Sequence, residues 1–463
     1  MFGVLSLIVL LTGMTLFSLA HPGFLFYLAF VALIAGYLIL SYFIGITGKG
    51  FDLEAHNNYP EHLDYTPTID VYLPTCGEPI EILANSYLHV RNLVWPRKEV
   101  WVLDDAGRSE VKDLAERQGF RYICRDEPRE LKKAGNIRNA FRLTGGELIL
   151  ILDADFCPRM DFITEVVKYF KDPKTAIVQT PQFFRIDQNE PWIQKGAAFV
   201  QELFYRLIQV SRDHFGAAIC VGTSAIYRRS ALIPFGGTAP IQYSEDLHTG
   251  HMLLSSGYRI RYLPIALSAG QCPDRISSYI TQQYRWCMGS ISLMLSRPFW
   301  RSNMTRMQRA CYCSGALYYI ATGVGVLFTP LPAILLSNFK PEFVYWYSVI
   351  FSLPSFIFGT VYLARWSKQP FGLYALKARN LSYYSHLLAL KDKLTGDLMP
   401  WVPTGNGSTN AKVKNVILIC RVWSVVSTSL VIFGAYSNWS YNFIPMLAFS
   451  SLSCYIAISS TLE

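Results

Sequence analysis

Residues 148–155 read Leu-Ile-Leu-Ile-Leu-Asp-Ala-Asp. An all-apolar run of this length that ends abruptly in charge predicts a β-strand buried on both faces, as in a parallel sheet. Asp153 and Asp155 flank a small residue at the end of that strand, so both carboxylates can face one hard cation such as Mg²⁺ or Mn²⁺. An isolated Asp-x-Asp also arises by chance, and only its position after a buried strand gives it weight.

Three further short runs rich in β-forming residues precede this one and alternate with helical segments. They are Thr68–Leu73, Glu99–Leu103 and Arg121–Cys124. The alternation predicts an α/β domain with a parallel sheet and crossover helices. Polar clusters directly follow two of these strands, at 74–78 and at Asp104-Asp105. Since ligands bind at the carboxyl ends of the strands in such sheets, we expect both clusters to meet Asp153 in one crevice.

Apolar segments on both sides of this domain are long enough to cross a membrane. The first 48 residues contain no Asp, Glu, Lys or Arg, and His21-Pro22-Gly23 divides 1–46 into two spans, which predicts a helical hairpin. A cleaved signal peptide over 1–20 is the alternative, but it lacks the usual positively charged start. Four later spans are expected at 311–336, 342–364, 416–436 and 443–460.

The polar connection at 365–414 carries eight Lys or Arg residues against two Asp residues. The positive-inside rule makes it cytosolic, and even numbers of spans on either side then place both termini and the central domain in the cytosol. We therefore expect a hairpin at 1–48, a cytosolic domain at 49–309 and four spans at 310–463. The net charge of +9 reflects this bias and indicates no nucleic-acid binding. The ten scattered cysteines predict neither zinc sites nor disulfides.

Two later motifs add acids and a cation. Glu245-Asp246 opens a predicted helix with Ser244 as its N-cap, so both acids could simply complement the helix dipole. In Gln282-Gln283-Tyr284-Arg285-Trp286, the first, fourth and fifth residues share one helix face. A Trp and an Arg at a membrane surface can also serve for anchoring alone. Asp104 and Asp105 could likewise cap a turn, and Lys133 could be a solvated charge.

The ordered set Asp104-Asp105, Asp153-Ala154-Asp155, Glu245-Asp246 and Gln282–Trp286 resembles the D,D,D,QxxRW signature of processive family 2 glycosyltransferases. That group contains the bacterial cellulose, chitin and hyaluronan synthases, and the stretches 178–184 and 220–225 resemble the cellulose synthase branch most. The resemblance implies a Rossmann-like mixed sheet of the GT-A type, inserted between all-α transmembrane helices. It covers about Thr68 to Trp286. Residues 220–225 depart from the usual Phe-Phe-Cys-Gly-Ser pattern of cellulose enzymes, which leaves a glucan linkage open.

The resemblance also implies roles for individual residues. Asp246, with Glu245 beside it, would be the general base, and Arg285 would stabilise the leaving diphosphate. The other implied contacts are with the nucleotide-sugar (Thr75, Glu78, Asp104, Asp105, Lys133, Asp153 and Arg285), with the metal Mg²⁺ or Mn²⁺ (Asp153 and Asp155) and with the acceptor (Trp286, Gln282, Gln283 and Cys220). The segment 401–405 would correspond to the gating loop that closes over UDP, although an ordinary Pro-Gly turn at the membrane is equally compatible with it.

The implied protein is an inverting polysaccharide synthase of the bacterial inner membrane. It would polymerise a UDP-sugar, with UDP-glucose favoured by the resemblance, and export the chain through its own helices. Arg421, within the 416–436 span, would then face a polar interior or snorkel to the surface. Two alternatives are a transferase adding one sugar to a lipid carrier and a non-catalytic transporter or scaffold. The sugar, the linkage, an accessory export subunit and a homo-oligomeric state are left open.

Overall fold

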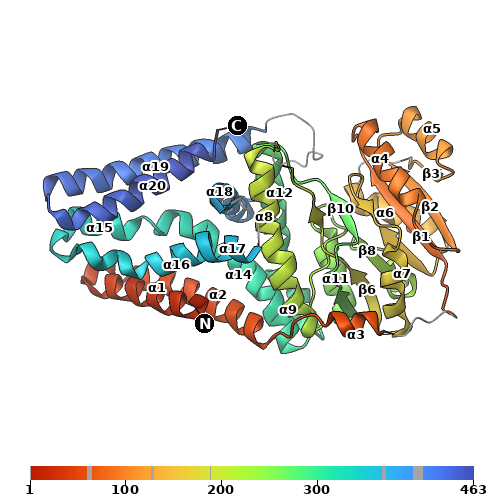
Figure 1. Cartoon of the computed structure of the whole chain (residues 1–463), viewed down its shortest axis with the longest axis horizontal. Helices are drawn as coiled ribbons and strands as arrows, with labels where there is room; N and C mark the ends of the chain where they lie inside the picture. The colour runs from red at the N-terminus through yellow and green to blue at the C-terminus, as the bar shows by residue number, and fades with distance from the viewer. Residues whose placement is uncertain are drawn as a thin grey trace.

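A computed structural model describes residues 2–59, 65–126, 130–187, 189–367, 372–399 and 410–462. The chain forms an elongated molecule with an α/β part at one end and long helices at the other (Figure 1). The N-terminal hairpin and the C-terminal helices lie side by side in the helical part, although they are far apart in the sequence (Figure 1). The α/β part is formed by the middle of the chain.

The main sheet has seven strands in the order β3-β2-β1-β4-β8-β6-β9. β1 pairs in parallel with β2 and β4, whereas β8 runs antiparallel to β4 and β6. This mixed α/β sheet confirms the predicted fold class, and each predicted strand is present with ends shifted by no more than two residues. The strands are β1 Ile69–Thr75, β2 Lys98–Asp104, β3 Arg121–Ile123, β4 Leu148–Ile151, β6 Thr175–Gln179, β8 Ala225–Arg228 and β9 Arg259–Tyr262, with a smaller sheet of β5 Cys157–Pro158, β10 Ser268–Gly270 and β7 Phe183–Phe184.

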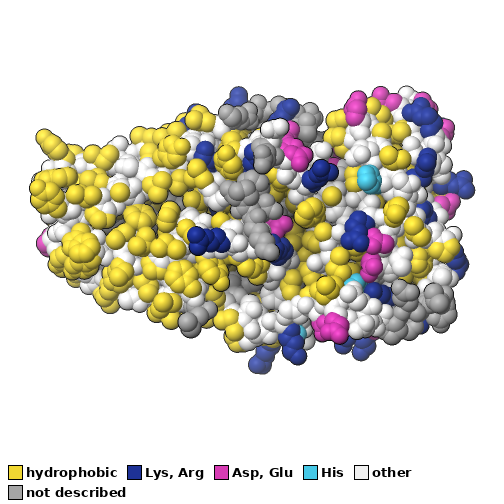
Figure 2. All heavy atoms as spheres, viewed as in Figure 1, with side chains coloured by type: hydrophobic (Ala, Val, Ile, Leu, Met, Phe, Trp, Pro, Cys, Tyr) yellow, Lys and Arg dark blue, Asp and Glu magenta, His cyan; other side chains and the backbone are white. Residues whose placement is uncertain are grey.

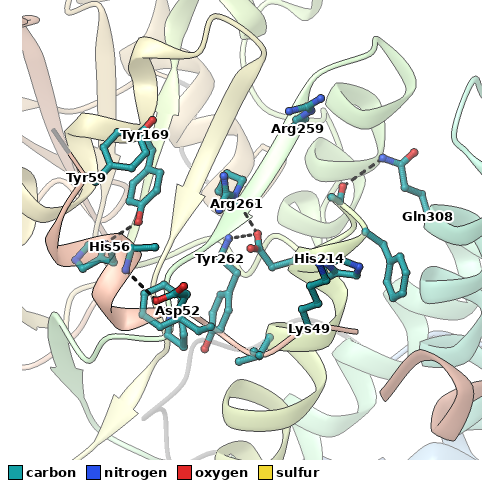
Figure 3. Close-up of a pocket in the computed structure, with 18 residues that line it drawn as sticks. Lys49, Asp52, His56, Tyr59, Tyr169, His214, Arg259, Arg261, Tyr262 and Gln308 are labelled. Carbon is teal, nitrogen blue, oxygen red and sulfur yellow. Dashed lines mark hydrogen bonds and ion pairs between the residues drawn. The ribbon is translucent and has the colours of Figure 1, made fainter. Parts of the chain in front are cut away.

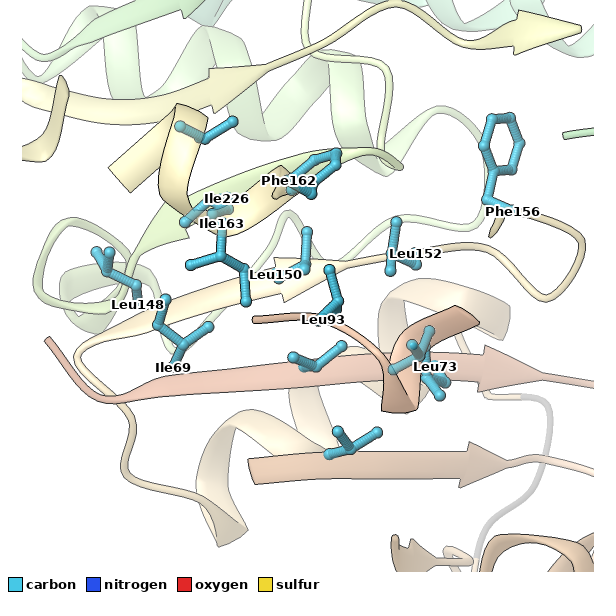
Figure 4. Packing of buried hydrophobic residues seen from close by; sticks show 14 of the residues in the cluster. Ile69, Leu73, Leu93, Leu148, Leu150, Leu152, Phe156, Phe162, Ile163 and Ile226 are labelled. Atoms are coloured by element: carbon cyan, nitrogen blue, oxygen red, sulfur yellow. The ribbon is translucent and has the colours of Figure 1, made fainter. Parts of the chain in front are cut away.

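β4 is buried on both faces, as its sequence predicts. Leu148, Leu150 and Leu152 point into one hydrophobic cluster together with Ile69 and Leu73 of β1 (Figure 4). Ile149 and Ile151 point into a second cluster on the opposite face. The helices that cover the sheet and link it to the membrane helices are α3 Leu53–Asn57, α4 Ile80–Arg91, α5 Ser109–Arg117, α6 Lys132–Leu143, α7 Phe162–Val167, α8 Trp192–Leu203, α9 Gln209–His214, α10 Arg229–Leu232, α11 Glu245–Ser255, α12 Ile276–Met294 and α13 Arg297–Arg301.

Five helical segments in the described part of the chain are long and apolar enough to span a membrane. They are Phe2–Leu19 (α1), Tyr27–Thr47 (α2), Arg306–Phe339 (α14 Arg306–Phe328 with α15 Leu331–Phe339), Ala411–Ser437 (α19) and Tyr441–Ser459 (with α20 Ile444–Ser459). Hydrophobic side chains cover the helical part, whereas charged side chains gather on the α/β part (Figure 2). Such an extended apolar surface indicates contact with lipid.

Two expectations about the C-terminal half are wrong in detail. The predicted span 342–364 is not one α-helix, because it consists of a 3₁₀ turn at Trp346–Phe351, α16 Leu353–Ile357, a π-turn at Phe358–Tyr362 and the start of α17 Leu363–Ser367. Pro354 near the start of α16 lacks the N–H that a continuous helix needs there. The connection 365–414 is also not merely a loop, since it contains the long helix α18 Gly372–Thr395.

α18 joins the α/β part to the membrane helices. It packs against α8, α12, α14 and α19. Side chains from α8, α12, α18, α19 and α20 form a single hydrophobic cluster, which includes Ile280, Leu381 and Val416. The helix that carries the late sequence motif therefore shares a core with helices that are long and apolar enough to span a membrane.

Arg421 does not face the interior of the helical part. Its side chain is exposed and donates to Oγ1 of Thr461 at 2.7 Å and to the Thr461 carbonyl at 3.0 Å. Of the two interpretations left open for Arg421, the exposed side chain does not fit a polar interior, and its guanidinium ties α19 to Thr461.

We expect Asp392→Ala to be strongly destabilising. Asp392 of α18 is fully buried, and its Oδ2 accepts from Nζ of Lys412 at 2.7 Å and from the Tyr284 hydroxyl at 2.9 Å. Removing one partner of a buried ion pair leaves the other charge uncompensated, at a cost of about 3–5 kcal/mol. Thermal unfolding in detergent measures the effect. Lys391→Ala is the control, and an equal loss of stability in that variant would contradict this account.

Candidate active site

The ends of β1 and β2 hold the first polar cluster. The hydroxyl of Thr75 donates to Oε2 of Glu78 at 2.5 Å, and the Cys76 N–H donates to the same oxygen at 2.7 Å. The Asp105 N–H donates to the Thr75 carbonyl at 3.0 Å. The predicted nucleotide-binding residues of the two strands are thus adjacent at one edge of the sheet.

Asp104 and Asp105 have different partners. Asp104 is fully buried and accepts from the Ala106 N–H at 2.9 Å, the Arg108 N–H at 2.8 Å and the Tyr122 hydroxyl at 3.0 Å. It therefore caps the turn, which is the alternative that the sequence leaves open, and its contact with the nucleotide-sugar stays a prediction. The carboxylate of Asp105 binds Arg125 in a bidentate manner, at 2.6 and 2.7 Å.

Arg125 is a residue that the sequence interpretation missed. It directly follows β3, the strand next to β2, and its side chain is 8% exposed. A bidentate pair of this kind fixes the direction of a carboxylate. An arginine just after an edge strand, beside a strand that ends in two acids, is the signal that could have identified it.

Asp153 and Asp155 follow β4, and Lys133 of α6 contacts Asp153. Its ammonium lies 2.5 Å from Oδ1 of Asp153 and donates to the Gly222 carbonyl at 2.9 Å. Burial lowers the pKa of Lys133, but Asp153, Glu245 and Asp246 outweigh it and the net shift is upward. Lys133 is therefore a charged group in contact with the acidic cluster, and not a solvated surface lysine.

The segment 220–224 folds back beside the end of β4. The Asp153 N–H donates to the Thr223 hydroxyl at 2.8 Å, and Oε1 of Gln179 accepts from the Val221 N–H at 3.0 Å. Ser224 has a φ of 52°, a left-handed conformation that is uncommon outside glycine. Strain of this kind persists where the surroundings fix it, and it clusters at functional sites.

Asp246 also lies next to this segment. A Cβ at Gly222 would lie 3.0 Å from Oδ2 of Asp246, so the Asp246 carboxylate is in contact with the turn that Lys133 binds. Burial raises the pKa of Asp246 to about 7, and the carboxylate of Glu245 adds to the shift. Ser244 precedes α11 as predicted, but it does not cap it: it has a φ of 53°, and its hydroxyl donates to the Arg285 carbonyl at 3.3 Å.

The pentad 282–286 lies on α12, as predicted. Burial lowers the pKa of Arg285, while the negative charges of Glu245, Asp153 and Asp246 oppose that shift. Oε1 of Gln282 and Nε2 of Gln283 are buried without a hydrogen-bond partner in the part of the chain that the structure describes. Trp286 is half-buried on the same helix.

Tyr284 in the middle of the pentad points elsewhere. Its hydroxyl donates to Asp392 and accepts from the Met399 N–H at 3.0 Å. The carbonyl of the same Met399 accepts from the Tyr243 hydroxyl at 2.9 Å. The segment that leads to Asp246 and the helix that carries Arg285 therefore both hydrogen-bond to the backbone of Met399. The predicted gating segment 401–405 lies outside the described residues.

Among the predicted site residues, Cys220 has the position that is least compatible with its predicted role, which is to contact the acceptor. Its side chain is 1% exposed and lies 3.1 Å from the Tyr227 hydroxyl within the core. Burial raises the pKa of this thiol to about 12. A direct contact between the Cys220 side chain and an acceptor is not available in this conformation. All ten cysteines are free thiols.

The pKa of Asp246 predicts how turnover depends on pH. In the role that the resemblance implies, Asp246 would be a general base and would have to be ionised, and with a pKa near 7 this carboxylate gains its proton as the pH falls through neutrality. We expect kcat to fall about tenfold for each pH unit below about 6 and to be constant above about 8. Initial rates between pH 5 and 9 measure this profile. A flat profile down to pH 5 would contradict the raised pKa.

Gly222→Ala tests the close approach of the 220–224 segment to Asp246. The backbone φ of Gly222 is +76°, which costs a residue with a Cβ about 1–2 kcal/mol. The added carbon would also push against the Asp246 carboxylate. We expect turnover to fall at least roughly tenfold, since small displacements of catalytic groups are costly. Gly257→Ala, which also has a positive φ but meets no neighbouring atom, is the control. Equal activity in both variants would show that the contact is unimportant.

Comparison with known sequences relates the central part of the chain to a known family. Residues 70–235 match the family "Glycosyl transferase family 2". This stretch contains β1, β2, β3, β4, β6 and β8 of the main sheet, except for the first residue of β1.

The curated relatives are similar to part of the chain. It is 34% identical over 260 residues to the cellulose synthase catalytic subunit [UDP-forming] of Pseudomonas fluorescens, an alignment that covers 55% of this chain and 35% of that protein. It is 33% identical over 284 residues to the cellulose synthase 1 catalytic subunit [UDP-forming] of Komagataeibacter xylinus, over 60% of this chain and 38% of that one. The chain thus spans well under half the length of these relatives. The predicted resemblance to cellulose synthase-like enzymes is confirmed.

A solved structure supports the fold. The mannosyltransferase PcManGT from Pyrobaculum calidifontis, in complex with GDP-Man and Mn²⁺, superposes with a TM-score of 0.56 at 17% identity, over 76% of this chain and 97% of that one. The GT-A-like mixed sheet expected from the sequence is confirmed.

Proposed function

We propose that the glycosyltransferase is a membrane-embedded, inverting polysaccharide synthase that uses a UDP-sugar, with UDP-glucose as the first candidate. The observation that carries the proposal is the arrangement around Gly222, where the Asp246 carboxylate lies beside the backbone and Lys133 links the Gly222 carbonyl to Asp153. A base, a cation and the acid that follows β4 are thereby held together. The UDP-forming cellulose synthases that it resembles support UDP-glucose.

Each group has a distinct task in the proposed reaction. Asp246 takes the proton from the acceptor hydroxyl, which attacks the anomeric carbon of the donor sugar as the bond to UDP breaks. Arg285 and Lys133 bring positive charge to the side where the diphosphate gains negative charge. In-line attack on an α-linked donor inverts the anomeric carbon and gives a β-linked product. Glu245 adds to the raised pKa of Asp246.

The oxygen ligands present fit a divalent cation. Asp153 and Asp155 follow one strand, and burial together with the Asp153 charge raises the pKa of Asp155 to about 7. Such mutual repulsion is what a bound cation relieves, and carboxylates suit Mg²⁺ or Mn²⁺. We propose that these two residues hold the metal, which when bound neutralises charge on the diphosphate.

Processive elongation is supported by the acceptor side of the site. The buried, unpartnered amide atoms of Gln282 and Gln283 are groups that sugar hydroxyls can satisfy. Trp286, on the same helix, offers an aromatic plane to a terminal sugar. A transferase that adds one sugar to a lipid carrier is the alternative, and the pentad argues against it.

Export through the protein's own helices is supported by polar and aromatic groups between α2, α14 and α18. The ring centroid of His386 lies 4.8 Å from that of Tyr319 and 5.6 Å from that of Tyr318, and that of Tyr37 lies 5.9 Å from that of Tyr318. Nε2 of His386 is buried without a partner among the described residues. A buried polar atom of this kind is one that the hydroxyls of a passing sugar chain can satisfy.

We further propose a bacterial inner-membrane location with both termini and the catalytic domain in the cytosol. The proposed division is a hairpin at 1–48, the cytosolic domain at 49–309 and the C-terminal helices at 310–463. The excess of Lys and Arg at 365–414 supports this orientation. The lipid bilayer, the donor and the growing polysaccharide are the proposed partners, and an accessory export subunit or a homo-oligomer stays open.

The test is UDP release by purified protein offered UDP-glucose, UDP-N-acetylglucosamine or UDP-glucuronate with Mg²⁺ or Mn²⁺. The product is sized and digested with linkage-specific glycosidases. A long β-linked polymer from one donor would establish the synthase and its substrate. UDP release with a single sugar on a lipid would favour the alternative transferase, and no release from any donor would contradict both.

A further inference from the structure

A pocket of 680 Å³ lies away from the catalytic residues, where α2 and α14 meet the α/β part. It begins at Lys49, two residues after α2 ends at Thr47, and it includes Gln308 in the first turn of α14. α3, α9 and β9 supply half of its other lining residues (Figure 3). If α2 and α14 span the membrane as proposed, this pocket lies at the level of the lipid headgroups.

Three cations line the pocket and are only weakly neutralised. Lys49 is exposed and has no ion pair among the described residues. Arg259 lies 3.8 Å from Asp172, and Arg261 lies 3.4 Å from Asp213, with side chains 58% and 43% exposed. Figure 3 shows Arg259 and Arg261 on the same strand, two residues apart. Residues at this spacing point to the same face of a strand.

The two acids in the pocket wall are already engaged by backbone donors. Asp52 accepts from the Ala55 N–H at 2.9 Å and so caps α3, and Asp213 accepts from the Tyr262 N–H at 2.7 Å. The guanidinium of Arg261 also lies 5.4 Å from the ring centroid of Tyr169, which holds it over an aromatic face. The pocket therefore presents net positive charge with spare hydrogen-bond donors, which suits a phosphate group.

An apolar surface leads into the pocket from the membrane side. Phe43 and Ile46, in the last two turns of α2, are 51% and 69% exposed. Their spacing of three residues places them on one side of the helix. A lipid whose acyl chains lie along this surface would bring its phosphate toward Lys49.

We propose that this pocket binds a phosphate-bearing anion, the headgroup of an anionic membrane lipid. The proposal uses the membrane placement of α2 and α14 but not the transferase chemistry. A soluble phosphate compound has the same recognition chemistry, and the experiment separates the two sources.

The test is native mass spectrometry of the full-length protein in detergent, titrated with phosphatidylglycerol and, separately, with phosphatidylethanolamine. Lys49→Ala/Arg259→Ala removes two pocket charges that make no short ion pair. Arg301→Ala/Arg306→Ala is the matched control, because it removes two exposed charges just before and at the start of α14, outside the pocket. We expect phosphatidylglycerol to bind roughly tenfold more weakly to the pocket variant than to the control.

Inorganic phosphate and glycerol phosphate, measured by calorimetry, form the soluble arm. One outcome is that inorganic phosphate or glycerol phosphate binds the unchanged protein but not the pocket variant, while lipid binding shows no selectivity. The pocket would then be a phosphate site whose ligand is a soluble compound. Equal lipid binding by the two variants, with no soluble binding, would overturn the proposal. Because no readout depends on turnover, a failed transferase assay would leave this result unaffected.

Discussion

Asp246→Asn is expected to reduce UDP release from the donor and acceptor by roughly 100- to 10,000-fold. The amide has nearly the same shape as the carboxylate but cannot take a proton from the acceptor hydroxyl. The buried surroundings that raise the pKa of Asp246 tolerate a neutral group, so the variant should fold. Donor affinity should change little, since the uridine and diphosphate contacts are proposed to be made by other residues. Initial rates and donor binding, measured separately, give the two values.

Two control variants separate proton transfer from structure. Asp246→Glu keeps the base but moves it by about one carbon–carbon bond, so partial activity is expected. Glu245→Gln removes the adjacent charge, which contributes to the raised pKa of Asp246, and should shift the pH profile toward lower pH. Full activity in Asp246→Asn would remove Asp246 from the mechanism and would favour a protein without catalysis.

The second large effect is expected at Asp155. Asp155→Asn removes one of the two proposed metal ligands, and we expect turnover to fall roughly 1000-fold, in line with several kcal/mol of lost charge stabilisation. Removal of divalent ions by EDTA should have an effect at least as large in the unchanged protein, and added Mn²⁺ or Mg²⁺ should restore activity. Steady-state rates against metal concentration measure both.

Asp161→Asn is the matched control, because it changes an exposed aspartate in the same region that pairs with Arg159. If turnover by Asp155→Asn saturates at the same metal concentration and rate as the unchanged protein, Asp155 is not a ligand. If activity persists in EDTA, Lys133 and Arg285 alone carry the charge of the diphosphate.

Much of the catalytic half could be predicted from sequence, because its signals are local. β4 is an unbroken apolar run that ends in Asp153, and the pentad on α12 has helical spacing. What could not be predicted depends on contacts between distant segments. Arg125 meets Asp105 only because β3 pairs with β2, and Arg421 meets Thr461 across two helices.

The membrane half was harder to predict, since hydropathy measures composition and not helix continuity. The run 342–364 is apolar enough to be a span, yet it changes between 3₁₀, α and π geometry around Pro354. α18 lies in a stretch whose charges indicate a cytosolic connection, yet it is packed on several sides by α8, α12, α14 and α19. This burial can be recognised only when the neighbouring helices are known.

Because α8, α12, α18, α19 and α20 share a single hydrophobic cluster, the α/β part and these helices should be stable only together. A fragment ending near residue 309 would keep the whole sheet but would expose the face of α12 that Leu381 and Val416 cover, and it would lose the partners of Tyr284. Such a fragment should aggregate when expressed alone. Recombination could therefore not transfer the α/β part to a different membrane anchor unless α18 and α19 were transferred with it.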